Sequence, residues 1–219
     1  MDHPEPVLRV VHEDGRLLAV EKPSGRLSVG SAGPSGESVQ AEASRLVGQD
    51  LFVVHRLDRG TSGLLLFARD LDTQRRLSSL FETRRVEKTY LALVLGHVDP
   101  SSGEIALPIR AFGSGRMGTD ERGKPSLTRY EVHERLPADD LLTVHPMTGR
   151  RHQVRVHLYA IGHPVLGDAD YGDPRPIGGA GRLMLHALEL RLPVADRPPL
   201  VLRAEPPADF HAILGERRG

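Results

Sequence analysis

One carboxylate in this sequence is placed as a reactive group would be. Asp58 lies in a short charged run between two apolar segments, 51–54 and 64–68, which predict strands. Two glycines in the run indicate a tight turn. Arg56 and Arg59 flank the carboxylate, and nearby positive charge favours the ionised form of a carboxyl group. An ionised carboxylate on a rigid loop can act as a nucleophile, a base or an electrostatic stabiliser, although the same run also fits a salt-bridged structural turn.

The segments around this turn must hold it in place, and most of them predict short strands. Alternating apolar residues predict strands at 7–12, 17–21, 88–95, 104–109, 127–132, 141–145, 188–192 and 200–204. Helical spacing predicts helices at 38–47, 70–83 and 208–214. Because strands and helices do not alternate regularly, we expect an α+β fold with a mixed, mainly antiparallel sheet flanked by helices.

Two further segments are less regular. Residues 150–161 alternate as a strand would, but their apolar side chains also fit a helix, and a glycine and a proline just beyond favour the helix. On such a helix Arg151 and Arg155 would share one face, which also fits an ordinary surface pair. The glycine-rich stretch 113–123 predicts a flexible loop.

Composition bounds the class of protein. The chain has 219 residues, of which 39% are hydrophobic, so we expect one domain over 1–219 with its core at about 7–214. The absence of cysteine excludes disulfides and thiolate metal sites. No apolar stretch is long enough to span a membrane, and the N-terminus does not resemble a signal peptide. We therefore expect a cytoplasmic monomer.

The charge balance gives no direct support for a nucleic-acid partner. The 29 basic and 29 acidic residues cancel, which argues against a basic tail. The arginines are nevertheless clustered, in pairs at 75–76, 84–85 and 150–151. Arginine suits bidentate contacts with phosphate, so these pairs are candidate RNA contacts, although genomic composition explains much of the arginine excess.

Histidines between positions 145 and 186 raise the question of a metal site. His152 and His157 are five residues apart, so they would diverge on a helix and lie on opposite faces of a strand. No HExxH pattern is present. We expect no metal.

Several segments, in order along the chain, resemble one family. Residues 54–69, VHRLDRGTSGLLLFAR, resemble the catalytic motif of RluA-type pseudouridine synthases, with Arg69 where the family usually has Lys. Residues 88–96, 148–158, 161–168 and 182–187 resemble its later motifs. Residues 21–25, EKPSG, resemble its Asn-Lys-Pro-x-Gly segment, with Glu21 in place of Asn.

The resemblance implies a set of site residues. Asp58 would be the catalytic carboxylate, Tyr90 would stack on the target base and take part in removing its C5 proton, and Arg155 would pair with Asp58. Further candidates for substrate and RNA binding are His55, Arg56, Arg59, Thr61, Lys88, Arg150, His152 and Gln153. The fold implied is a single pseudouridine-synthase-like domain, and the reaction requires no cofactor.

The resemblance also implies a substrate class. The chain is similar to compact, catalytic-domain-only members that modify tRNA, large-subunit rRNA or both, and its motifs leave no room for a separate N-terminal RNA-binding domain. An alternative is a non-catalytic RNA-binding or RNA-folding module on the same scaffold. A metal- or carboxylate-dependent hydrolase is a third and more remote alternative.

Overall fold

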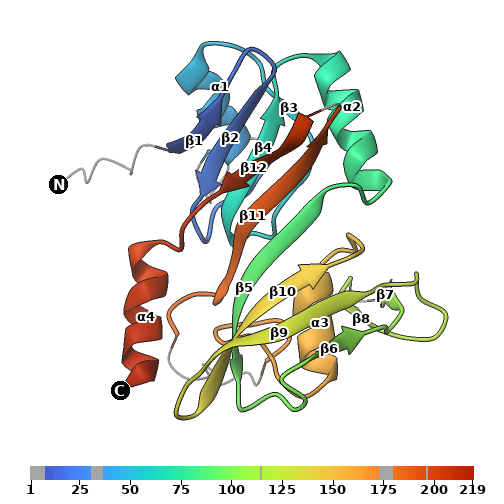
Figure 1. Ribbon diagram of the computed structural model, residues 1–219, viewed down its shortest axis with the longest axis vertical. Helices are drawn as coiled ribbons and strands as arrows, with labels where there is room; N and C mark the ends of the chain where they lie inside the picture. Colours follow the sequence, from blue (N-terminus) through green and yellow to red (C-terminus); the bar gives the residue numbers. More distant parts are fainter. Residues whose placement is uncertain (1–7, 31–36, 114, 173–179, 196) are drawn as a thin grey trace.

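A computed structural model describes residues 8–30, 37–113, 115–172, 180–195 and 197–219. Within these ranges ten strands form one sheet (Figure 1). Eight of them follow the order β1 (Arg9–Glu13), β2 (Leu17–Lys22), β4 (Ser62–Ala68), β11 (Leu185–Val194), β5 (Glu87–Leu95), β10 (Asp139–Pro146), β9 (Thr128–Arg135), β6 (Ser102–Ile105). Two more pair at the side of this path, β3 (Phe52–Val53) with β4 and β12 (Arg197–Arg203) with β11.

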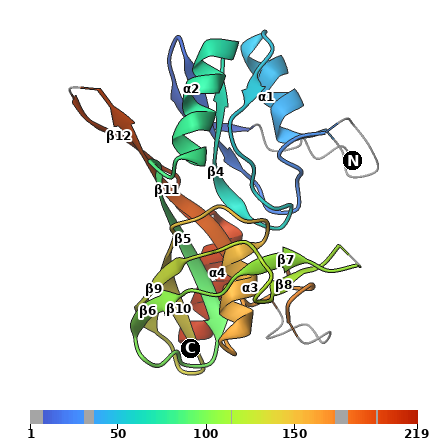
Figure 2. The same cartoon turned by 90° about the vertical axis from the view of Figure 1, so that its right-hand side faces the viewer.

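The sheet is mixed and mainly antiparallel, as predicted. Only the ladder between β4 and β11 is parallel among the described strand pairs. A separate hairpin of β7 (Ile109–Ala111) and β8 (Met117–Thr119) projects from the lower half of the molecule (Figure 2). The predicted α+β class is therefore confirmed.

Four helices accompany these strands in the described ranges. They are α1 (Val39–Val47), α2 (Leu71–Glu82), α3 (Gln153–Ala160) and α4 (Ala208–Arg218). The hydroxyl of Ser38 caps the start of α1, and the carboxylate of Asp70 caps the start of α2, as such side chains do at helix N-termini. Figure 1 shows α1 and α2 beside the half of the sheet that contains β1 to β4, and α3 behind β9 and β10. None of the helices described is long and apolar enough to cross a membrane.

Strand β4 is the rigid support of the Asp58 turn. All seven of its residues are buried. Leu64 and Leu66 pack into one hydrophobic cluster, and Leu65 and Phe67 pack into another on the opposite face. Gly63 has a φ of +112°, and a Cβ there would meet the carbonyl oxygen of Ala187 at 2.2 Å, so the close approach of β4 to β11 requires glycine. The turn that contains Asp58 therefore ends on a strand with little freedom to move.

Three local predictions were wrong. Segment 104–109 is divided between β6 and β7 instead of forming one strand. Segment 113–123 contains β8, so it is partly a hairpin and not a free loop. Helix α3 begins at Gln153, so Arg151 lies in the preceding turn and does not share a helix face with Arg155.

Candidate active site

Asp58 lies in a cleft of about 1060 Å³ that residues of α2 and α3 both line. Figure 2 shows these two helices in different halves of the molecule. Three groups of residues line the cleft: segment 53–59 with Thr61, one face of α2, and segment 148–155. Lys88 and Tyr90 of β5 also face it. Elements far apart in sequence thus surround one carboxylate.

The Asp58 turn is anchored by the segment that follows β2. The Lys22 side chain is fully buried, and its Nζ donates to the carbonyl oxygens of Arg59 at 3.0 Å and Thr61 at 2.8 Å. The Ser24 hydroxyl donates to the carbonyl of Gly60 at 2.6 Å, so each carbonyl from 59 to 61 has a partner in this segment. Burial lowers the pKa of Lys22 to about 7, although the charge of Asp58 opposes this shift. Segment 22–25 therefore fixes the shape of the turn.

Arg155 approaches Asp58 from helix α3. Its Nη1 donates to Oδ2 of Asp58 at 3.4 Å. Its Nε and Nη2 donate to the two carboxylate oxygens of Asp168 at 2.7 and 2.6 Å, and Nη2 also donates to Asp170 at 2.6 Å. Burial opposes the charge on Arg155, but the hydrogen bonds and charge of Asp168 raise its pKa above the usual value. The guanidinium is 7% exposed, which makes it a fixed cation beside a carboxylate that is 26% exposed.

His152 contacts the other side of Asp58. It caps the start of α3 with a left-handed backbone, φ +57°, and its Nε2 lies 3.8 Å from Oδ1 of Asp58. Its Nδ1 lies 2.8 Å from the hydroxyl oxygen of Tyr171. Burial lowers the pKa of His152, while Asp58 opposes this, so the ring is neutral at pH 7. A neutral ring with its hydrogen on Nε2 can donate toward Asp58 and accept from Tyr171.

Tyr90 presents its ring to the same cleft from the middle of β5. Its strand is held on both sides, since Tyr90 pairs with Val144 of β10 and Ala187 of β11. Burial and the charge of Asp58 raise the pKa of its hydroxyl well above the usual value. The phenol is therefore protonated at neutral pH, and it offers an aromatic face and a hydroxyl donor.

Comparison with known proteins decides the family. The family model of RNA pseudouridylate synthases matches residues 16–160. The chain belongs to the RNA pseudouridylate synthase family. It is 40% identical over 191 residues to the dual-specificity RNA pseudouridine synthase RluA of Vibrio cholerae, covering 85% of this chain and 77% of that protein. It is 41% identical over 192 residues to the protein of the same name from Pasteurella multocida, covering 85% of this chain and 87% of that protein.

Solved structures agree with this assignment. The human protein RNA pseudouridylate synthase domain containing 1 has a TM-score of 0.81 and 31% identity, covering 97% of this chain and 90% of that chain. Human RNA pseudouridylate synthase domain containing 4 has a TM-score of 0.80 and 28% identity, covering 96% of this chain and 93% of that chain. The chain is an RNA pseudouridine synthase, and the predictions of family and enzyme class are confirmed.

The flanking arginines of the synthase motif do not pair with Asp58. Arg59 donates from Nε to the carbonyl of Gly25 at 2.8 Å. Arg56 is exposed, lines the cleft and forms no ion pair with the residues described. The expectation that these two arginines are the cations beside Asp58 was therefore wrong. The arginine that pairs with Asp58 is Arg155, which reaches it from helix α3.

Three other predicted residues of the synthase shape the walls of the cleft. Thr61 is buried, and its backbone N–H donates to the carbonyl of Asp58 at 3.1 Å. His55 accepts at Nε2 from the backbone N–H of Leu66 at 3.1 Å, and burial lowers its pKa to about 3. Gln153 is buried, and both ends of its amide form hydrogen bonds within the protein. Any effect of Gln153 on RNA binding would therefore be indirect, through the shape of segment 148–153.

Sequence reasoning assigned no role to the acidic partners of Arg155. Asp168 is the last residue of segment 161–168, which resembles a family motif, and Asp170 lies two residues beyond it; that motif was the available signal. Arg150 is brought to the cleft as predicted, with Nη2 donating to the carbonyl of Pro125. Among the described residues, no three histidine or acidic side chains are grouped as a metal site would require.

Proposed function

We propose that this synthase converts specific uridines of tRNA, large-subunit rRNA or both into pseudouridine, with Asp58 as the reacting carboxylate and no cofactor. The observation that supports Asp58 most directly is its 3.4 Å contact with Arg155, a cation that two further carboxylates hold in place. The relatives from Vibrio cholerae and Pasteurella multocida are named dual-specificity RNA pseudouridine synthases, which supports a substrate range of this kind.

The reaction balances without an external reagent. The N1–C1′ bond of the uridine breaks, the uracil turns, and a C5–C1′ bond forms. The proton on C5 is lost and N1 gains one, so the change is an isomerisation with no oxidation or reduction. Asp58 either attacks C1′ and is later displaced, or assists formation of a glycal at the sugar. In both routes Arg155 places a positive charge beside the carboxylate and fixes its orientation.

The cleft must also hold an uridine that has left its stack. Enzymes that act on a base inside folded nucleic acid extrude it into a pocket. Stacking of a base on an aromatic ring contributes about 1–3 kcal/mol. Tyr90 supplies such a ring in the cleft that holds Asp58. Its protonated hydroxyl can relay the C5 proton, directly or through water, when the phenol oxygen accepts that proton as its own proton passes to water.

Release of tritium from RNA labelled at uridine C5 tests this function. Wild type and Asp58→Asn are incubated with unmodified tRNA and large-subunit rRNA transcripts, without cofactor and with a chelator present. Wild type should release tritium from at least one RNA, and Asp58→Asn should release none above background. Asp72→Asn is a control, since Asp72 is an exposed carboxylate on α2 that pairs with Arg75.

The other outcomes have definite meanings. Near-normal release by Asp58→Asn would remove Asp58 from the chemistry. Binding of both RNAs by wild type without release would favour a non-catalytic RNA-binding module. Loss of release only in the presence of the chelator would contradict the absence of a cofactor.

A further inference from the structure

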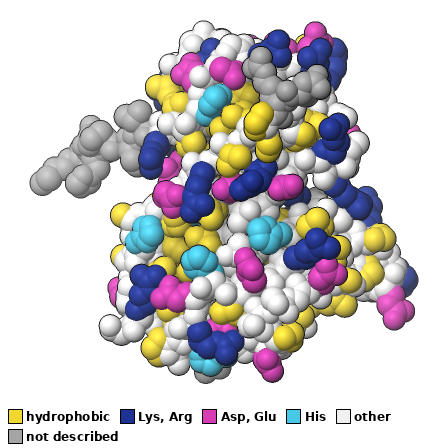
Figure 3. Space-filling view, in the orientation of Figure 1, with side chains coloured by type: hydrophobic (Ala, Val, Ile, Leu, Met, Phe, Trp, Pro, Cys, Tyr) yellow, Lys and Arg dark blue, Asp and Glu magenta, His cyan; other side chains and the backbone are white. Residues whose placement is uncertain are grey.

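The cleft is lined by cations that have no acidic partner. Elsewhere, arginines such as Arg75 and Arg122 pair with nearby carboxylates. On the face shown in Figure 3, side chains of both charges are interspersed. Within the described ranges, the cleft-lining cations that form no ion pair with a carboxylate are Arg56, Arg59, Arg84, Lys88, Arg150 and Arg151.

Arg84 has an unusual backbone for its residue type. It follows the end of α2 with φ +60°, in the left-handed region that side chains other than those of Gly, Asn and Asp rarely occupy. Apart from glycines, only Arg84 and His152 have positive φ among the residues described, and both line the cleft. At Arg84 this conformation closes the C-terminus of α2, where the backbone N–H groups of Arg84 and Arg85 donate to the carbonyls of Phe81 and Leu80 at 3.2 and 2.9 Å. This helix end places Arg84 at the cleft.

Lys88 lines the same cleft as Arg84 and is partly buried. Its Nζ donates to the carbonyl of Thr148 at 3.2 Å. Burial and the charge of Arg84 lower the pKa of Lys88 to about 8. Glu82 is the one other carboxylate besides Asp58 that lines the described cleft, and it is exposed and forms no ion pair with either cation. Two neighbouring cations without a counterion are a favourable site for an anion.

We propose that Arg84 and Lys88 form a subsite for a backbone phosphate of the RNA next to the target uridine. Lys88 is two residues before Tyr90 on β5, so both side chains project from the same face of the strand toward the cleft. A phosphodiester there carries one negative charge; it would accept hydrogen bonds from both cations, offset part of their repulsion and hold the RNA strand while the uridine enters. This inference rests on the proposed function, since it places the phosphate relative to the base on which Asp58 acts.

Arg84→Gly tests the subsite without straining the backbone, because glycine adopts positive φ readily. We expect its thermal midpoint to equal or exceed that of wild type and its kcat at saturating RNA to be unchanged. KM should rise about five- to tenfold at physiological salt, and the slope of log kcat/KM against log salt should become shallower by about 0.7–1, as expected for the loss of one phosphate contact. Lys88→Met should show the same change in slope.

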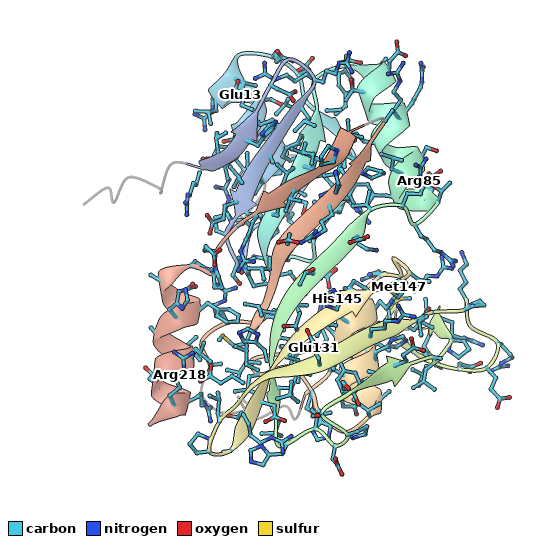
Figure 4. All side chains as sticks on the ribbon, in the orientation of Figure 1. Glu13, Arg85, Glu131, His145, Met147 and Arg218 are labelled. Atoms are coloured by element: carbon cyan, nitrogen blue, oxygen red, sulfur yellow. The ribbon has the colours of Figure 1, made fainter. Side chains whose placement is uncertain are left out.

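Arg85→Ala is the matched control. The sequence made the pair 84–85 a candidate RNA contact, but in the structure Arg85 is exposed and lies outside the cleft lining, unlike Arg84. Figure 4 labels Arg85 beside the end of α2. Arg85→Ala should keep the wild-type KM and salt slope. The proposal is overturned if Arg84→Gly also keeps the wild-type KM and salt slope. It is overturned as well if Arg85→Ala changes KM and the salt slope as much as Arg84→Gly does, since that would indicate a general electrostatic attraction of RNA and not a localised phosphate site.

Binding of a fluorescein-labelled single-stranded RNA separates this proposal from the proposed function. If wild type releases no tritium but Arg84→Gly still lowers the salt slope of RNA binding and Arg85→Ala does not, the function is wrong and the subsite stands. If wild type releases tritium and the two variants bind alike, the function stands and the subsite is wrong.

Discussion

At the scale of single residues, the hydrogen bonds of Arg155 hold the cation beside Asp58 in a fixed position. Arg155 forms four hydrogen bonds to three carboxylates, and only one of these bonds reaches Asp58. The bidentate pair with Asp168 fixes the plane of the guanidinium, whereas Asp170 adds one bond from a carboxylate that is 56% exposed. Asp168 is therefore a positioning residue that acts on Asp58 through Arg155.

Replacing Asp168 by Asn should lower kcat by about 10²-fold with little change in KM, since small misplacements of a reacting group have effects of this size. Asp170→Asn should lower kcat much less. Single-turnover rates, KM and thermal midpoints of both variants check this. Equal losses in the two variants, or a loss that appears only in KM, would contradict the positioning role.

Tyr90→Phe separates the ring from the hydroxyl. The ring and its stacking remain, so KM should change little. We expect kcat to fall about 10²-fold or more, the usual contribution of a group that takes part in proton transfer. The raised pKa of Tyr90 means that this transfer involves the protonated phenol at neutral pH. Tritium release at saturating RNA measures the effect, and an unchanged kcat would leave Tyr90 with stacking alone.

The sequence predicted the residues that react better than the residues that hold them. The contact between Arg155 and Asp58 was predicted from two motifs, and the structure brings the two residues together. Asp168 and Lys22 could not be assigned in the same way. Asp168 contacts a residue 13 positions away in the sequence, and Lys22 contacts one 37 positions away. The sequence also does not distinguish a buried lysine from an exposed one.

At the scale of elements, predictions succeeded where apolar periodicity was long and failed where strands were short. Strands such as β4 and β5 show sustained apolar patterns, and both were predicted. Strands β7 and β8 have three residues each, too few to show a period of two against a glycine-rich background. The helix at 150–161 was predicted, but its start was placed three residues early, because His152 begins it without a side-chain cap.

One link between elements should make stability depend on pH. His186 of β11 is fully buried, with Nδ1 2.9 Å from the Ser62 hydroxyl and Nε2 2.8 Å from the carbonyl of Ala204. Burial lowers its pKa from 6.5 to about 4, although the hydrogen bond to Ala204 opposes this. Between these pH values the unfolded chain binds more protons than the folded one, so this contribution to stability is present above about 6.5 and is lost as pH falls toward 4.

His186→Gln keeps one donor and one acceptor but removes the titration. The urea midpoint of wild type should fall over this pH range more steeply than that of the variant. Other titrating groups are common to both proteins, so the difference between the two curves isolates His186. Parallel curves would show that this histidine is not buried in its neutral form.

At the scale of the whole molecule, a net charge of zero is compatible with RNA binding. Many arginines are neutralised by carboxylates in ion pairs, whereas the cleft keeps cations that have no such partner. Among the described residues, six cations that form no ion pair with a carboxylate line the cleft. Each contact with a phosphate of single-stranded RNA contributes about −0.7 to the slope of the logarithm of the binding constant against the logarithm of salt concentration. If all six cations bind phosphate, the expected slope is about −4. Titrations of labelled RNA over a range of salt concentrations measure it. A slope near zero would contradict phosphate binding in the cleft, and a much steeper one would require cations outside it.

The described cleft lining contains seven arginine and lysine side chains and two carboxylates, so it carries an excess of positive charge. Because the formal charges of the chain sum to zero, the rest of the chain carries the balancing negative charge. Such a molecule has an electric dipole moment even though it would hardly migrate in an electrophoresis gel near neutral pH. In the field of an RNA, a dipole experiences a torque before any contact forms, so the protein turns its cleft toward the strand as it approaches. Collisions would then become productive more often than for an unoriented sphere, and added salt would slow association by shortening the distance over which this torque acts.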